Sequence, residues 1–433
     1  MAVHSADSAG VAAPSTSRYR WTICALLFAA TTINYIDRQV LGILAPTLSR
    51  ELHWSEQDYG AIASWFSFAY ALGFLGAGRL LDRAGVRKGF AVAIVAWSLA
   101  AMSHALASTA NGFSLARAAL GFGESGNFPG AIKATAEWFP RKERAFATGI
   151  FNAGSNVGAI ITPLVVPWIT LTYGWRWAFI ATGGLGFLWL IAWLALYRTP
   201  EESRHVSAAE LAYIRSDPVE REDAVTWREI LGHRQTWAFV VGKLLTDPVW
   251  WFYLFWLPKF LDARFGIKLA GLAAPLVVIY MVADIGSVGG GWLSSTLIKR
   301  GATVNRGRKT ALLIAAVLII PTMMAPRMSS LWGAVAVVSL AAAAHQWWSA
   351  NLFTTASDMF PRRAVATVVG FGGFAGAMGG VVFQRVIGWM LQHDPTAYGR
   401  IFIFCGCIYV IALGIMHLIV PRLEPARMAG DPA

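Results

Sequence analysis

Apolar runs of about 20 residues recur along the whole chain, and each is long enough to cross the hydrocarbon core of a bilayer, about 30 Å thick. Hydrophobic residues make up 56% of the 433 residues and charged residues only 14%, roughly half the charged share of a soluble protein. The sequence therefore predicts an all-α polytopic membrane protein and excludes a secreted domain, a cytosolic enzyme and a disordered chain. We place the membrane-spanning helices at 19–47, 57–81, 88–108, 112–138, 145–170, 176–197, 236–261, 270–297, 309–326, 329–358, 365–391 and 398–420.

Basic residues are distributed unevenly between the loops. Most of the 36 Lys and Arg fall at the N-terminus and in every second loop after it, and the alternating loops hold few. Cytoplasmic loops of membrane proteins carry such an excess. We therefore expect both termini in the cytoplasm and an even number of spans. The net charge of +12 is then a signal of topology, and we expect the bilayer rather than a nucleic acid as partner.

The apolar pattern stops between about 198 and 235, which divides the spans six and six. An internal repeat supports this division, because Glu137-Trp-Phe-Pro-Arg-Lys follows the fourth span and Asp358-Met-Phe-Pro-Arg-Arg follows the tenth. Parallel repeated halves place a substrate site at their interface near the bilayer midplane. The predicted domains are a disordered cytoplasmic leader at 1–18, six-helix bundles at 19–197 and 236–420, a cytoplasmic connector at 198–235 with a short surface helix at 208–216, and a cytoplasmic tail at 421–433.

Ionisable residues occur inside several predicted spans, where each costs several kcal/mol and usually marks a functional site. Structural ion pairing is the alternative role, but three opposite-charge pairs in the first, fourth and seventh spans exceed what holding a bundle requires. The residues are Asp37, Arg38, Arg117, Glu124, Lys243, Asp247, Asp284 and Arg385.

The planar guanidinium group of an arginine binds both oxygens of a carboxylate, so an inward arginine favours a carboxylate ligand. Arg38 is the first candidate, with Lys243 facing it from the second half. A carboxyl group in a partly dry cavity can carry a proton near neutral pH. We expect Glu124 to do so, with Arg117 two turns away on the same helix face to control it, and Asp37 as a second proton site.

Polar side chains in two other spans are candidates for contacts with substrate hydroxyl groups. Asn152 and Asn156 share one face of the fifth span, and His345 and Gln346 lie in the tenth. Buried amides also bond neighbouring helices, so ligand contact and helix packing both stay open for these residues.

Patterns typical of cofactor and metal sites fail their structural tests. The stretch from Gly121 to Gly126 fits G-x-G-x-x-G, but it lies within an apolar helix that no strand precedes, which excludes a dinucleotide site. Cys405 and Cys407 point to different helix faces, so we expect neither a metal site nor a disulfide. No soluble catalytic domain lies outside the spans. We therefore expect no cofactor besides a coupling proton, and a transporter rather than an enzyme.

The loop after the second span reads Gly78-Arg-Leu-Leu-Asp82-Arg83-Ala-Gly85-Val-Arg87-Lys88. Ordinary positive-inside charge is one explanation of its bases. Alternatively, Asp82 accepts bonds from a neighbouring helix N-terminus and makes a breakable conformational latch with Gly78, Arg83, Gly85 and Arg87. These residues at these intervals resemble the signature of the major facilitator superfamily. That resemblance implies twelve transmembrane helices in two pseudo-symmetric six-helix bundles that work by alternating access.

Motifs inside the spans resemble one family within this superfamily. Asn34-Tyr-Ile-Asp37-Arg38, together with Arg117-(x)6-Glu124 followed by Asn127-Phe-Pro, is similar to the anion:cation symporter family. The motifs Lys243-Leu-Leu-Thr-Asp247-Pro and His345-Gln346 are similar to its bacterial hexuronate branch. The resemblance implies that Arg38 binds the substrate carboxylate and that Asp37 and Glu124, with Arg117, couple protons. It also implies that Tyr35 and Tyr70 line the cavity, and it assigns no role to Arg385.

This resemblance implies a proton-coupled importer of a hexuronate, such as glucuronate or galacturonate, that works as a monomer in a bacterial inner membrane. Two alternatives stay open. One is a symporter or exchanger of another organic anion, for example an aldonate, an aldarate or an aromatic acid. The other is a membrane sensor or an intramembrane enzyme that uses the buried charges.

Overall fold

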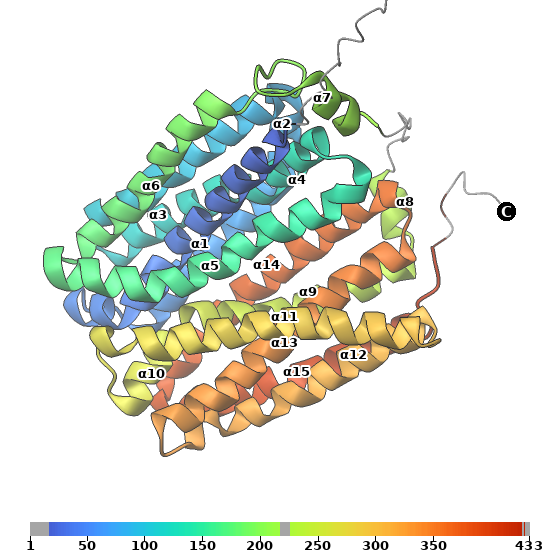
Figure 1. Ribbon diagram of the computed structural model, residues 1–433. Helices are drawn as coiled ribbons and strands as arrows, with labels where there is room; N and C mark the ends of the chain where they lie inside the picture. The colour runs from blue at the N-terminus through green and yellow to red at the C-terminus, as the bar shows by residue number, and fades with distance from the viewer. Residues whose placement is uncertain (1–16, 217–225, 427, 429–433) are drawn as a thin grey trace, which may run out of the picture.

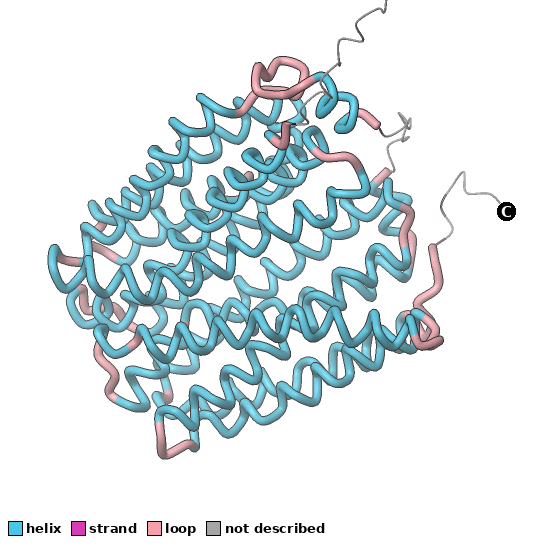
Figure 2. The backbone as a smooth tube through the Cα atoms, viewed as in Figure 1, coloured by secondary structure: helices cyan, strands magenta, loops and turns pink. Residues whose placement is uncertain are grey.

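The computed structural model describes residues 17–216, 226–426 and 428, apart from the side chains of a few helical residues. Most of the predicted leader, part of the connector and the end of the tail lie outside the described residues. The described residues form helices and the turns between them, and no strand occurs among them (Figure 2). The prediction of an all-α fold is confirmed.

Two bundles of helices lie side by side in Figure 1, and the first is formed by the N-terminal half of the chain. Its elements are α1 (Tyr19–Glu51), α2 (Glu56–Ser103), η1 (His104–Leu106), α3 (Ala110–Glu124), α4 (Asn127–Trp138), α5 (Arg141–Tyr173) and α6 (Trp175–Leu196). The connector follows with α7 (Ala208–Ile214), at the place predicted for a short surface helix, and α8 (Trp227–Leu231).

The second bundle is formed by the C-terminal half of the chain. Its elements are α9 (Arg234–Phe255), α10 (Leu257–Phe265), η2 (Leu269–Gly271), α11 (Ala273–Lys299), α12 (Val304–Ile319), η3 (Ile320–Arg327), α13 (Leu331–Met359), α14 (Arg362–His393), η4 (Pro395–Ala397) and α15 (Tyr398–Ile419).

The helices do not correspond one to one with the predicted spans. Three spans are each interrupted, and two spans are joined in a single helix. The second and third spans form the single element α2, in which Gly85 turns the chain with φ of 73° and ψ of 159°. Glycine tolerates such a positive φ at little cost. The fourth span breaks between α3 and α4, the seventh between α9 and α10, and the ninth continues from α12 into η3. Within the described residues the helices thus make twelve passes in two sets of six, as predicted.

Eight of the described helical segments are long and apolar enough to cross a membrane by length and composition alone. The other passes are the first, fourth, seventh and tenth, formed by α1, by α3 with α4, by α9 with α10, and by α13. These four contain Arg38, Glu124, Lys243 and His345, respectively. Polar residues lower their mean hydropathy, so the least apolar passes are those that hold most of the candidate site.

The bundles meet along two pairs of helices, α2 with α14 and α5 with α11. One end of the molecule, here the basic end, holds the start of α1 with Arg20, the connector and the Gly85 turn, and Figure 1 shows α7 and α8 there. The other end, here the α10 end, holds α10 and the turn between α1 and α2.

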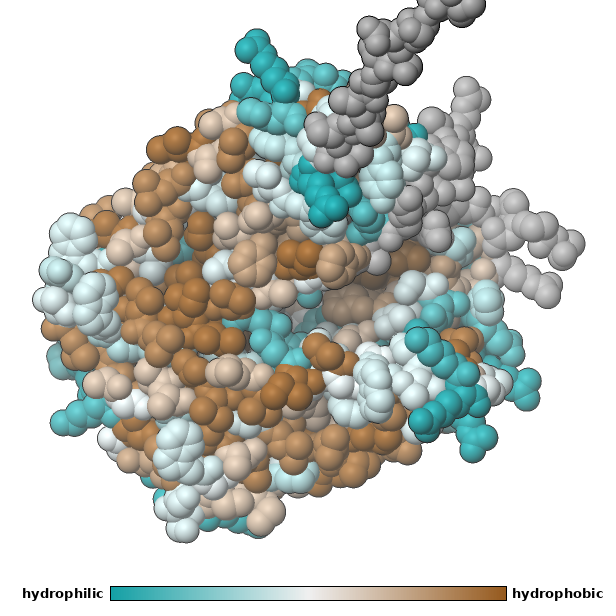
Figure 3. All heavy atoms as spheres, in the orientation of Figure 1, coloured by the Kyte–Doolittle hydropathy of each residue, from teal (hydrophilic) through white to brown (hydrophobic). Residues whose placement is uncertain are grey.

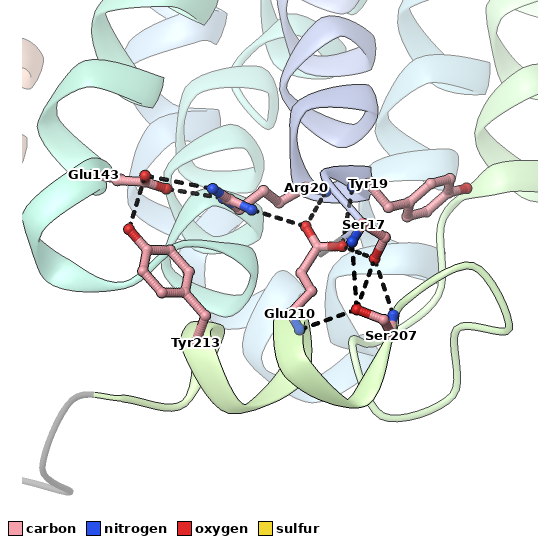
Figure 4. A network of polar contacts seen from close by, with 7 residues as sticks. All are labelled: Ser17, Tyr19, Arg20, Glu143, Ser207, Glu210 and Tyr213. Carbon is pink, nitrogen blue, oxygen red and sulfur yellow. Dashed lines mark hydrogen bonds and ion pairs between the residues drawn. The ribbon is translucent and has the colours of Figure 1, made fainter. Parts of the chain in front are cut away.

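At the basic end, the connector is fixed to the first bundle by a buried carboxylate (Figure 4). Glu210 of α7 accepts hydrogen bonds from the backbone N–H groups of Tyr19 and Arg20, at 3.1 and 3.2 Å, and from the Arg20 side chain at 3.0 Å. Arg20 also pairs with Glu143 of α5 at 2.9 Å. An anion at a helix N-terminus is stabilised by the helix dipole and by the free N–H groups there. Glu210 therefore caps α1 from a distant part of the chain.

Replacing Glu210 by alanine is expected to destabilise the protein by about 1–3 kcal/mol, because it leaves buried donors without an acceptor. The measurement is the midpoint of thermal unfolding in detergent. Glu202→Ala is the matched control, since Glu202 is an exposed carboxylate of the same connector. An unchanged midpoint for Glu210→Ala would show that α7 does not stabilise α1.

Candidate functional site

Arg38 and Glu124 form a buried ion pair that joins α1 to α3. Arg38 donates from Nε to Glu124 Oε2 at 2.9 Å, and its Nη2 lies 2.8 Å from the same oxygen. Nη2 also donates to Asn34 Oδ1 at 3.3 Å. Among the described atoms, Glu124 Oε1 has no hydrogen-bond partner. A buried pair that is incompletely bonded carries a large desolvation cost, so a proton or an anionic ligand that replaces one partner has free energy to gain.

Four aromatic rings surround the guanidinium group of Arg38. Its Cζ atom lies 4.7 Å from the ring centre of Tyr35, 4.9 Å from that of Tyr70 and 5.2 Å from that of Phe66. The fourth ring, 5.4 Å away, belongs to Trp251 of α9 in the second bundle. Aromatic faces attract a desolvated cation. The arginine therefore lies at the boundary between the bundles, where a substrate would contact both halves.

Arg117 lies beside this pair and is fully buried. Its Nη1 donates to the backbone oxygen of Arg38 at 3.1 Å, and its Cζ lies 4.4 Å from the ring centre of Phe66 and 5.2 Å from that of Phe255. The sequence places Arg117 and Glu124 on one helix face, yet the direct partner of Glu124 is Arg38. Arg117 instead fixes the backbone of α1 at the residue that holds the carboxylate.

The side chain of Asp37 points in a different direction from that of its neighbour Arg38, because successive residues of an α-helix are rotated by about 100°. Its side chain is 2% exposed, and its carboxyl group is close to Glu124 and to the hydroxyl group of Thr182 on α6, although no hydrogen bond of good geometry reaches either oxygen among the described atoms. A buried carboxyl group that is poorly hydrogen-bonded costs far less free energy when neutral than when ionised. This environment is suited to a group that binds and releases a proton.

Lys243 and Asp247 form the ion pair of the second bundle. Lys243 Nζ lies 2.7 Å from Asp247 Oδ2, one turn further along α9, and 4.3 Å from the ring centre of Phe353. Asp247 itself packs on α14 at Gly376, where an added Cβ would meet Oδ2 at 2.3 Å. The two side chains neutralise each other, so Lys243 does not present an uncompensated positive charge.

His345 is buried and bonded rather than exposed to a ligand. Its ring stacks on Trp250 with centroids 5.1 Å apart, and its Nδ1 shares a short hydrogen bond with Tyr409 of α15. Among the other polar candidates, Gln346 and Asn156 are half-buried and Asn152 is exposed. The structure brings Arg38, Tyr35, Tyr70, Glu124 and Arg117 together, whereas His345 sits behind Trp250, within the second bundle.

The predicted latch lies partly outside the described residues, since the side chain of Asp82 and the surroundings of Gly78 are not described. Arg83 is exposed, and Gly85 forms the turn within α2. Arg87 donates from Nη2 to the backbone oxygen of Leu194 at 2.6 Å, on α6 of the same bundle. In this conformation Arg87 therefore braces the first bundle and does not reach the second.

Ion pairs link the two bundles at the α10 end. Lys259 of α10 contacts Glu56 Oε1 at 2.7 Å and Ser49 Oγ at 3.2 Å, both from the first bundle. Arg50 contacts Asp262 Oδ2 at 2.5 Å. These contacts hold α1 and α2 against α10 and close the space between the bundles at this end.

Backbone contacts complete this closure. Tyr59 of α2 donates to the backbone oxygen of Phe255 at 2.5 Å, and a Cβ on Gly60 would meet the Cα of Gly388 at 3.1 Å. Figure 3 shows the surface hollowed between the bundles, with hydrophilic residues inside the hollow. The structure is thus sealed at the α10 end and hollowed between the bundles elsewhere, one of the two arrangements that alternating access requires.

The sequence profile of the Major Facilitator Superfamily matches residues 27–384. The chain belongs to the Major Facilitator Superfamily. Members of this family are transporters, so the prediction of a polytopic transporter rather than an enzyme is confirmed. The prediction of the superfamily itself is confirmed as well.

Relatives of known activity match this transporter over most of its length. The hexuronate transporter of Escherichia coli strain K12 is 34% identical over 425 residues, which are 96% of this chain and 98% of that protein. The galacturonate transporter of Dickeya chrysanthemi is 33% identical over 309 residues, which are 70% of this chain and 89% of that protein. The crystal structure of a D-xylose-proton symporter aligns with a TM-score of 0.76 at 15% identity, covering 95% of this chain and 100% of that one, and supports the fold alone.

Three contacts of the transporter were not predicted from the sequence. Phe66 and Trp251 flank Arg38, but a single aromatic residue in an apolar span carries no signal of its position. Arg385, for which the sequence gives no role, donates from Nε to Ser64 Oγ at 2.7 Å and so ties α14 to α2 across the interface. Such contacts depend on how two helices are rotated against each other, which local sequence does not specify.

Proposed function

We propose that this transporter imports a hexuronate, such as glucuronate or galacturonate, together with a proton. The observation that carries the proposal is the buried pair of Arg38 and Glu124 among aromatic rings from both bundles. Arg38 has the donor geometry for a carboxylate, and its present partner is itself a carboxylate that a proton can neutralise. The hexuronate and galacturonate transporters that it resembles support the substrate class.

The proposed coupling of substrate to proton follows from competition between Glu124 and the substrate carboxylate for one cation, Arg38. While Glu124 is ionised, it occupies the guanidinium group of Arg38. A proton on Glu124 releases Arg38, which then binds the substrate carboxylate between Tyr35 and Tyr70. The buried charges balance when both ligands are present or when neither is, whereas either ligand alone leaves an uncompensated charge, so only the fully loaded and the empty sites close readily. Asp37 serves as a second proton site beside this pair, and Arg117 holds α1 in place.

The proposed orientation follows from the positive-inside rule. The basic end with both termini and the connector at 198–235 faces the cytoplasm of a bacterial inner membrane, and the α10 end faces outward. The bundles at 19–197 and 236–420 are the two moving units, and a monomer is sufficient, because all proposed site residues lie in one chain. The hollow then opens toward the cytoplasm, where substrate is released.

Uptake into proteoliposomes tests this proposal. Labelled glucuronate is expected to accumulate when the pH outside is below the pH inside, and to equilibrate without accumulation when the gradient is collapsed by an ionophore. Unlabelled galacturonate is expected to compete. Empty liposomes and protein-containing liposomes with the ionophore are the controls.

Other results would favour the alternatives. Competition by aldonates or aromatic acids, with none by hexuronates, would move the substrate to another organic anion. Counterflow without gradient-driven accumulation would identify an exchanger. Absence of uptake and of binding for every organic anion in the panel would overturn the proposal of an anion transporter.

A further inference from the structure

One face of α9 carries three residues at intervals of four, Lys243, Asp247 and Trp251, and Trp251 reaches the first bundle from this face. Trp251 contacts the guanidinium group of Arg38 at 5.4 Å. Asp247 lies four residues before Trp251 on α9, about 6 Å along the helix axis. Asp247 is therefore placed one helical turn from the ring that covers Arg38, next to the space in which the substrate carboxylate is proposed to bind.

The side chain of Asp247 is only partly buried. Its side chain is 17% exposed although it lies in the middle of α9, and its pair with Lys243 uses Oδ2. Gly376 of α14 provides the room for it, since any side chain there would collide with Oδ2. An ionised carboxylate accepts hydrogen bonds and donates none. It is suited to sugar hydroxyl groups and unsuited to another carboxylate.

The two bundles differ in the positive charge that each offers to an anionic ligand. On the first bundle, a proton on Glu124 would leave Arg38 free for one carboxylate. On the second bundle, Lys243 is already neutralised by Asp247, so no spare cation awaits a second carboxylate. A dianion bound at Arg38 would place its second carboxylate beside a pair that offers no positive charge to compensate it, and an uncompensated buried charge is one means by which a specific site rejects a ligand.

We infer that Asp247 is a specificity-determining residue. It accepts hydrogen bonds from the hydroxyl groups of a monocarboxylic sugar acid that lie farthest from the acid's carboxylate, and it excludes the corresponding dicarboxylic acid. This inference rests on the proposed function and deepens it, since it separates hexuronates from aldarates, which share their carbon number and most of their hydroxyl groups. Lys243 acts with Asp247 as a neutral pair and is not a free anion-binding site.

Competition for labelled glucuronate uptake in proteoliposomes tests this inference, with galacturonate and galactarate as the competitors. For the wild type, galactarate is expected to inhibit at least about tenfold more weakly than galacturonate. In Asp247→Asn, which keeps the side-chain size, the uncompensated Lys243 is expected to narrow this difference by about tenfold or more. Asp394→Asn, an exposed carboxylate in a loop, is the matched control and is expected to keep the wild-type ratio.

A second variant separates charge from packing. Lys243→Met combined with Asp247→Asn restores neutrality and is expected to return the preference for the monocarboxylate. Equal inhibition by the two acids in the wild type, or an unchanged ratio in Asp247→Asn that still transports glucuronate, would overturn the inference while leaving the proposed function intact. Absence of glucuronate uptake in the wild type would instead remove the proposed function and the inference with it.

Discussion

Glucuronate binding is expected to be lost when Arg38 is replaced by alanine. Truncating one member of a buried, hydrogen-bonded charge pair typically costs about 2–5 kcal/mol, and a loss in this range weakens Kd by at least about 30-fold. The Arg38 side chain donates from Nε to Glu124 Oε2 and from Nη2 to Asn34 Oδ1, and the cation of the second bundle, Lys243, is already bound to Asp247. Equilibrium binding of labelled glucuronate to the purified protein measures the effect.

Two further variants make this result specific. Arg38→Lys keeps the positive charge without the planar pair of donors, so we expect a substantial loss of affinity in it as well. Arg400→Ala removes an exposed arginine from the first turn of α15 and is expected to bind normally. Folding is checked by gel filtration and by the thermal midpoint. Wild-type affinity in a folded Arg38→Ala protein would exclude Arg38 from the binding site.

Glu124→Gln is expected to separate binding from energy coupling. Glutamine mimics the protonated carboxyl group and cannot ionise, so Arg38 no longer has a charged competitor and binding of the anion is retained or strengthened. Accumulation driven by an inward proton gradient is expected to disappear, so that the internal concentration reaches only that outside. Exchange of labelled for unlabelled glucuronate is expected to persist, because that half-cycle requires no change in protonation.

The measurement compares gradient-driven uptake and counterflow in the same proteoliposome preparation. Glu202→Gln, which replaces an exposed carboxylate of the connector, is the matched control and is expected to behave as the wild type in both assays. Persistent accumulation by Glu124→Gln would assign proton coupling elsewhere, with Asp37 as the next residue to replace. Loss of both activities would assign Glu124 to substrate binding rather than to coupling.

The fold followed from sequence because its signals are local. Apolar length sets each span, and the loop charges and the stop at about 198 divide the spans into two halves, so the twelve passes were predicted with end points a few residues from those observed. The breaks within passes were not predicted. The interruption after Glu124 and the turn at Gly85 depend on packing and on backbone conformation, which an apolar pattern does not encode.

The site was predictable in its members more than in its contacts. An ionisable residue in hydrocarbon is visible from sequence, which is why Arg38, Glu124 and Lys243 could be named. Their partners were not visible: Glu124 pairs with a residue of another helix rather than with Arg117 on its own, and His345 turns away to Tyr409. Partner choice depends on the rotation of each helix within its bundle, and only the three-dimensional structure specifies it.

The seal at the α10 end also limits which sequences can work. Gly60 and Gly388 bring the backbones of α2 and α14 into direct contact, so the closed arrangement exists only while both positions lack a side chain. A single methyl group at either position would push the two helices apart and prevent full closure at this end. The ion pairs of Lys259 and Arg50 would be lengthened rather than lost. Closure at the α10 end therefore depends on the absence of side chains at Gly60 and Gly388 as much as on the ion pairs there.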